Sequence, residues 1–172
     1  MKNRSLFTLL GLIISLGTIS AQSDYFYAPN ARFDEKIPTP EEYLGYPIGT
    51  LHTRHDAIVG YMRELARLSD RAVLDTIGET YEHRQLVVLK VTSPENHSNL
   101  EQIRQDHLKL VDPNQSLEDY NDMKSIVLLG YNVHGNEPSS SEAALLTAYY
   151  YVAGMSAEVT NAFVTSALMP AT

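Results

Sequence analysis

The sequence predicts an α/β fold, a mixed sheet flanked by helices, and two patterns carry this prediction. Apolar residues recur at helical spacing in several segments, and short apolar runs of strand length lie between those segments. Their order along the chain is helix, strand, strand, helix, strand, helix, helix, which is typical of helices packed on a sheet. We expect helices over 54–69, 99–110, 139–152 and 156–168, and strands over 72–78, 86–92 and 125–131.

The first helix and the two strands after it are indicated by clear periodicity. The apolar positions of the helix repeat at intervals of three and four, and Thr53 with Asp56 resembles a capping box at its start. The two following strands are separated by a polar turn through Tyr81 and His83. A β-hairpin is therefore expected directly after the first helix.

The third strand contains an unbroken apolar run from Ile126 to Leu129. Such a run is typical of a strand covered by helices on both faces, so we expect it at the centre of the sheet. The helix over 139–152 follows it, and Gly154 is placed to end that helix. The chain then stops where the central strand would still need a second neighbour, which predicts an open apolar edge and an incomplete fold.

The N-terminal segment reads as an export signal over residues 1–21. Lys2 and Arg4 precede an apolar run that ends at Ile19, and small residues up to Ala21 suit a signal peptidase. The run is shorter than the roughly 20 apolar residues of a spanning helix. We therefore expect an exported protein, periplasmic or extracellular, with an extended proline-rich leader over 22–50 and a domain over 51–172.

Composition limits the partners and the metal chemistry. The chain has no cysteine, so it forms no disulfide and would have to hold zinc through nitrogen and oxygen atoms. Loss of Lys2 and Arg4 with the signal leaves 11 of the 13 basic residues against 21 acidic ones, a net charge of −10. This charge argues against nucleic acid or an anionic membrane as partner, and the sequence sets no oligomeric state.

The candidate site is the segment 131–138, which lies between the third strand and the next helix. Open α/β sheets place their binding residues at this kind of position. His134 and Glu137 stand three residues apart on a turn, where a ring nitrogen and a carboxylate can converge on one zinc, and Gly135 would let the backbone turn between them. A hydrogen-bonded loop histidine is the alternative interpretation of His134, because the spacing alone is weak evidence.

Three stretches of the chain are similar to the zinc metallocarboxypeptidases, peptidase family M14, and in particular to large exported bacterial members. The stretches are 44–49 with the helix that ends at 65–69, the hairpin segment 77–84, and the segment 134–137, which resembles the family's first metal motif. They cover about 40–154 in the expected order. The resemblance implies an incomplete zinc-carboxypeptidase-like fold that acts on the C-termini of peptides or proteins.

The resemblance also implies what each site residue would do. His134 and Glu137 match the first two zinc ligands, while the family's third ligand, its general base and its substrate-binding arginines lie beyond the segment that this chain covers. We therefore expect no catalytic residue here and no activity from these 172 residues. The chain departs from the family at His83, which replaces a turn glycine and would be strained at positive φ, and at the tail 159–172.

Two other functions remain open from the sequence. One is a non-catalytic secreted fragment or binding module, and the other is a zinc-dependent amide hydrolase or deacylase of related fold. The spaced pair His52 and His55 has only Asp56 as an acidic neighbour, so we expect solvated residues at a helix start there. The three tyrosines 149–151 point in different directions on a helix and are expected to be packing residues.

Overall fold

The computed structural model describes residues 23–114 and 123–171, with the backbone alone described from residue 162 onward. The chain divides into two compact units, 1–31 and 32–172. The first contains the short helix α2 (Ser23–Phe26), and the predicted signal over 1–21 lies outside the described residues. The second unit contains the sheet and the helices that pack on it, so the mixed α/β prediction is confirmed.

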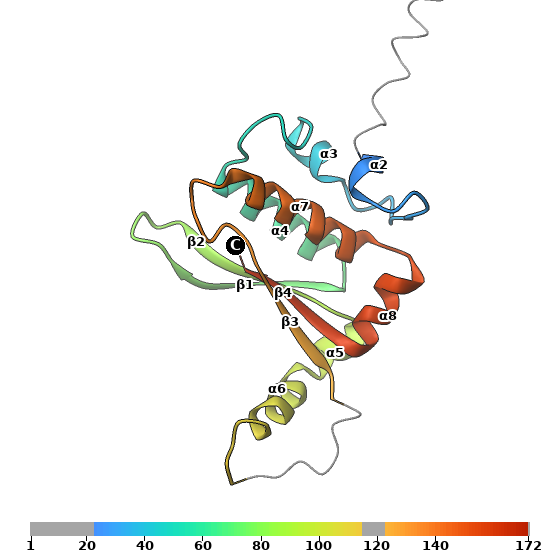
Figure 1. The fold of residues 1–172 in the computed structure, drawn as a ribbon, viewed down its shortest axis with the longest axis vertical. Helices are drawn as coiled ribbons and strands as arrows, with labels where there is room; N and C mark the ends of the chain where they lie inside the picture. Colours follow the sequence, from blue (N-terminus) through green and yellow to red (C-terminus); the bar gives the residue numbers. More distant parts are fainter. Residues whose placement is uncertain (1–22, 115–122, 172) are drawn as a thin grey trace, which may run out of the picture. The chain divides into compact units, whose positions relative to one another are not determined.

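The sheet has four strands in the order β1-β2-β4-β3 (Figure 1). β1 (Ala72–Glu79) and β2 (Gln85–Val91) form the predicted antiparallel hairpin, with an irregularity between Thr76 and Gly78. β4 (Ser166–Ala171) pairs antiparallel to β2 and parallel to β3 (Ser125–Gly130). The sheet is therefore mixed, and β4 alone joins β3 to the hairpin.

The central position predicted for the third strand is wrong. β3 lies at the edge of the described sheet, because the segment predicted as the end of a helix over 156–168 instead forms β4 and takes the inner place. Helix α8 (Ala157–Thr165) ends before it. Successive β3 residues point to opposite faces, and Ile126 and Leu128 are exposed as well as Val127, so neither face is covered as predicted.

Two helices build the core against the sheet. α4 (His55–Leu68) packs on β1 and β2, and α7 (Pro138–Ala153) lies beside α4 (Figure 1). β2 alternates, with one side of the strand buried and the other partly exposed, which is typical of a sheet with one covered face. Most of the largest fully buried side chains come from α4, β2 and α7: Tyr61, Met62, Leu65, Val87, Leu89, Val91, Leu145 and Val152.

The predicted capping box of the first helix is wrong. α4 begins at His55 after the N-cap Arg54, whose side chain makes no capping hydrogen bond. Thr53 lies one residue too early, and its hydroxyl is used in a contact with α7 instead. A capping box does occur in the predicted leader, where Thr39 and Glu42 cap each other's backbone at the start of α3 (Pro40–Leu44).

The connection from β2 to β3 consists of two helices and a loop. α5 (Pro94–Ser98) is capped by Ser93, and α6 (Leu100–Lys109) corresponds to the helix predicted over 99–110. On α6, hydrogen bonds from Arg104 and Gln105 lower the pKa of Glu101 to about 2. The acidic loop follows, and most of it, 115–122, lies outside the described residues.

Residues 32–50, predicted as a leader, belong to the second compact unit. Phe33 forms a β-bridge with Gly154 and stacks on Tyr149 with 4.8 Å between ring centroids. Burial raises the pKa of Tyr149 to about 12. This tyrosine therefore packs in the interior, as predicted. Within the described residues, no helix has both the length and the apolar character needed to cross a membrane.

Candidate functional site

The candidate turn joins the end of β3 to the start of α7. Gly130 ends the strand and Pro138 opens the helix, so His134 and Glu137 lie on the short connection between them. The backbone N–H of Glu137 donates to the carbonyl oxygen of His134 at 3.0 Å, which closes one turn of chain between the two residues. Both residues are thus held on the same turn, as the sequence predicted.

Contacts with α7 fix the entrance to this turn. The backbone N–H of Asn132 donates to Ser140 Oγ at 2.7 Å, and the Tyr131 hydroxyl donates to Thr147 Oγ1 at 2.9 Å. Asn132 has φ of 56°, a left-handed conformation that asparagine tolerates better than most residues. Gly135 stands in the turn between His134 and Glu137, as predicted, but its φ lies outside the left-handed region, so this turn does not depend on the conformational freedom of glycine.

The side chains of His134 and Glu137 are both exposed. Within the described residues, neither one makes a hydrogen bond or an ion pair, so the alternative of a hydrogen-bonded loop histidine finds no partner there. Glu137 is the N-cap residue of α7, but its carboxylate does not cap the helix. A ring nitrogen and a carboxylate therefore remain available for a ligand on one turn of chain.

A hollow of about 320 Å³ lies beside the turn. Gly135 and Asn136, the two residues between His134 and Glu137, form part of its wall. The opposite wall brings in residues that are distant in sequence. The complete lining is His52, Thr53, His55, Ile58, Arg84, Tyr131, Asn132, Gly135, Asn136, Pro138, Ser141 and Ala144.

Sequence reasoning did not connect Arg84 with His52 and His55. His52 is exposed in the loop before α4 and His55 begins α4, as predicted, and both also line this hollow with Arg84 from the hairpin. The Nε2 N–H of His55 donates to the carbonyl oxygen of Gln85 at 2.9 Å, which ties the start of α4 to the start of β2. That contact between distant segments leaves no periodic signal in the sequence.

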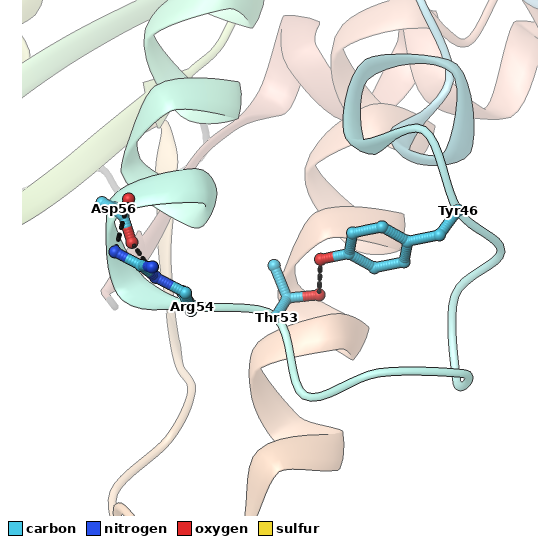
Figure 2. A network of polar contacts seen from close by, with 4 residues as sticks. All are labelled: Tyr46, Thr53, Arg54 and Asp56. Carbon is cyan, nitrogen blue, oxygen red and sulfur yellow. Dashed lines mark hydrogen bonds and ion pairs between the residues drawn. The ribbon is translucent and has the colours of Figure 1, made fainter.

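The loop before α4 is held on α7 by a buried carboxylate. Glu142, which is 7% exposed, accepts hydrogen bonds from the backbone N–H of Gly49 at 2.7 Å and from Thr53 Oγ1 at 3.2 Å. The Tyr46 hydroxyl in turn donates to Thr53 Oγ1 at 3.1 Å (Figure 2). Because Gly49 has φ of 86°, a side chain at this position would be strained. The loop carrying His52 is therefore fixed relative to the turn.

One comparison with known proteins decides the family. The zinc carboxypeptidase family of peptidases matches residues 58–168, nearly two thirds of the chain. The chain belongs to the zinc carboxypeptidase family. The match runs from α4 through the turn with His134 and Glu137 into β4, so it also includes most of the tail that departs from the family pattern. Neither the curated proteins nor the solved structures gave a match.

Because it belongs to this family, the protein is of the class of hydrolases that act on peptides. The family is one of zinc enzymes, and a histidine nitrogen and a carboxylate oxygen are both donors that zinc accepts. His134 and Glu137 thus offer donors of the two kinds that zinc accepts. The described residues contain no group of three or more side chains able to hold a metal ion, whereas catalytic zinc normally has three protein ligands.

Proposed function

We propose that this chain carries the first metal-binding segment of a zinc carboxypeptidase, with His134 and Glu137 as two of the zinc ligands. The observation that supports this most is the turn itself. It holds an exposed histidine and an exposed glutamate at the end of β3 and the start of α7, inside the segment that matches the family. The substrates would be the C-termini of peptides or proteins.

The roles of the chain's own residues follow from this arrangement. Zinc, when bound, would polarise the scissile carbonyl and lower the pKa of a bound water. His134 and Glu137 would hold the metal, while Asn132 and Ser140 keep the turn against α7. A third protein ligand would come from outside the described residues, because those residues offer no third side chain near the pair.

A second function is favoured by the count of ligands. Two donors bind zinc more weakly than three, since each lost ligand removes a directional bond. On its own, the chain would then act as a non-catalytic binding module that retains the family's fold. An amide hydrolase or deacylase would need the same third ligand, so no observation favours it over the carboxypeptidase.

Export is proposed on the N-terminal sequence. Lys2 and Arg4 followed by the apolar run to Ile19 have the order of a signal peptide, and Ala21 would precede the cleaved bond. The mature protein would then begin at Gln22 and lie in the periplasm or outside the cell. N-terminal sequencing of the protein from those fractions tests this, and a mature chain that still begins at Met1 would rule out cleavage.

The metal proposal is tested by zinc binding to the purified chain. Equilibrium dialysis against buffered free zinc should show one weak site that is lost in His134→Asn and in Glu137→Gln. The matched control is His83→Asn, because His83 and Glu79 form another exposed histidine and glutamate pair, with 3.4 Å between Nδ1 and Oε2. This control should bind zinc as the unaltered chain does.

The outcomes separate the two functions. Zinc lost in both site variants and kept in the control supports the metal segment. Zinc binding that is equal in all four proteins would show that the turn is not a metal site. The non-catalytic binding module would then be the remaining function. Circular dichroism of each variant establishes that the fold is intact, since all three substitutions are on exposed side chains.

A further inference from the structure

Three basic side chains gather on one side of the hollow beside the turn. His52 comes from the loop before α4, His55 from the first turn of α4, and Arg84 from the residue before β2. We call these three residues the basic rim. Among the described residues that line the hollow, none is acidic, although the whole chain carries a net charge of −8. The rim is therefore a local exception to the acidity of the protein.

Hydrogen bonds fix the backbone that carries the rim and the ring of His55. Thr53, next to His52, is bound to the buried Glu142 of α7. The ring of His55 is fixed by its hydrogen bond to Gln85. Arg84 is tied at its backbone, because its carbonyl oxygen accepts from the Thr80 N–H at 2.8 Å and its N–H donates to Thr80 Oγ1 at 3.2 Å. Loop, helix and hairpin are therefore fixed where they carry the three residues, which all line the same hollow.

Arg84 is free to exchange its present partner. Its guanidinium group lies 2.7 Å from a carboxylate oxygen of Glu82, and the two side chains are 59% and 72% exposed. Ion pairs exposed to this extent contribute little, because water and salt screen them and both side chains lose rotamer freedom. Glu82 does not line the hollow, whereas Arg84 does. A carboxylate bound in the hollow could therefore replace Glu82 as the partner of the Arg84 guanidinium group at little cost.

The composition of the rim favours an anion over a second metal ion. A guanidinium group stays positively charged and cannot act as a metal ligand, and it would repel a cation bound to the two histidines. The same fork of N–H groups matches the two oxygens of a carboxylate. The hollow has the volume of a small-ligand site, at about 320 Å³. The rim therefore suits an acidic side chain by its charge, and the hollow has room for one.

We propose that the basic rim binds an acidic side chain of the peptide substrate, close to the cleaved bond, with Arg84 as the specificity-determining residue. This inference rests on the proposed function, because it takes the neighbouring turn to be the metal site. Gly135 and Asn136 stand between His134 and Glu137 and also line the hollow, so the two sites share one turn. A peptide that reaches the turn would therefore pass close to the basic rim.

The test measures peptide binding rather than turnover. Dye-labelled pentapeptides that carry glutamate or glutamine before a C-terminal alanine are titrated with the purified full chain at low ionic strength, with fluorescence anisotropy as readout. The glutamate peptide should bind about tenfold more tightly than the glutamine peptide, as expected for one charge-assisted pair. Added salt should reduce this ratio. Amidated forms of both peptides test whether the terminal carboxylate is the group that binds instead.

Arg84→Gln should bring the two affinities close to equal. Arg104→Gln is the matched control, because Arg104 also forms an exposed pair, with Glu101 on α6, and its loss changes the net charge equally. This control should keep the tenfold ratio. Equal binding of both peptides to the unaltered chain, or a preference that survives Arg84→Gln, would overturn the proposal, as would a preference that disappears with the amidated peptides.

The metal proposal is read from a separate signal. Loss of zinc in His134→Asn reports on the turn, and the peptide ratio in the presence of a chelator reports on the rim. Zinc binding that depends on His134, together with equal binding of the two peptides, would contradict only the proposal about the basic rim. A peptide preference that depends on Arg84 without any zinc site would sink the proposed function and leave the acidic-peptide site.

Discussion

Among the described residues, two that are not glycine adopt left-handed backbone conformations: Asn132 in the candidate turn and His83 beside Arg84. Asn132 has φ of 56° and His83 has φ of 58°. Asparagine is among the residues that enter this region most readily, whereas a left-handed conformation costs most residues with a Cβ about 1–2 kcal/mol. The strain expected for His83 from its replacement of a family glycine is therefore confirmed by its backbone.

Replacing His83 with glycine should make the protein more stable. The substitution removes the Cβ clash and loses some stability through the greater freedom of glycine in the unfolded chain, so we expect a gain of about 0.5–1 kcal/mol in the free energy of unfolding. Urea unfolding followed by circular dichroism measures it. The ion pair of His83 with Glu79 is exposed and should matter little.

Glu82→Gly provides the control in the same turn. Glu82 is outside the left-handed region, so glycine there brings only added freedom in the unfolded state and should lower stability. A loss of stability in both variants would contradict the strain at His83.

The sequence predicted which site residues lie together when they are close along the chain. It did not predict this for residues that only the fold brings together. His134 and Glu137 are close because only two residues separate them, so their spacing predicts their neighbourhood directly. Arg84 and His55 meet because a ring nitrogen of α4 bonds to the first carbonyl of β2, and no pattern in a single chain records such a contact. Glu142 was missed because a buried carboxylate inside an apolar helix shows its donors only in three dimensions.

At the scale of elements, periodicity predicted those segments that have clear boundaries. Helix α4 and the β1-β2 hairpin agree with prediction to within one or two residues, because polar turns separate them. The segment 156–168 was predicted as one helix, yet α8 ends at Thr165 and β4 begins at Ser166. No glycine or proline marks this change, so an apolar run of that length does not distinguish helix from strand.

β3 is an edge strand with an apolar surface. Leu128 is 68% exposed and Ile126 is 40% exposed, and on its outer side β3 pairs with no other strand of the described sheet. Unpaired N–H and C=O groups beside exposed apolar side chains are a template for pairing with another chain. The purified protein should therefore associate with itself as its concentration rises.

Leu128→Lys should reduce this association, because a charge on an edge strand opposes strand addition. Sedimentation velocity over a range of concentrations would show more monomer in the variant than in the unaltered chain. Val111→Lys is a suitable control, since Val111 is 76% exposed but lies outside every strand. If both lysine variants lowered association equally, net charge rather than the β3 edge would be the cause.

At the scale of the whole molecule, the number of zinc ligands decides whether the proposed metal site can be catalytic. The described residues contain no cluster of three candidate ligands, and catalytic zinc in proteins is normally held by three side chains and a water. Membership of the zinc carboxypeptidase family gives the class of reaction. The two ligands that we propose would be one short of that set.

The purified chain should show negligible carboxypeptidase activity, because two ligands neither bind zinc tightly nor orient it. Mass spectrometry of a mixture of peptides with free C-termini, incubated with the protein and zinc, should show the same products as the chelator-treated sample. Turnover that disappears with a chelator and in His134→Asn would contradict this, and would mean that the third ligand lies outside residues 23–114 and 123–171 or in a second subunit.

The position of β4 sets an order in which the sheet can be assembled. During synthesis the N-terminal segments emerge first, so the hairpin and α4 can dock while the rest of the chain is still being made. β3 comes next but has no described partner until β4, which follows only after α7 and α8. The apolar side chains of β3 therefore stay exposed to solvent until β4 has been synthesised. A chaperone that binds extended apolar segments would bind β3 during this interval.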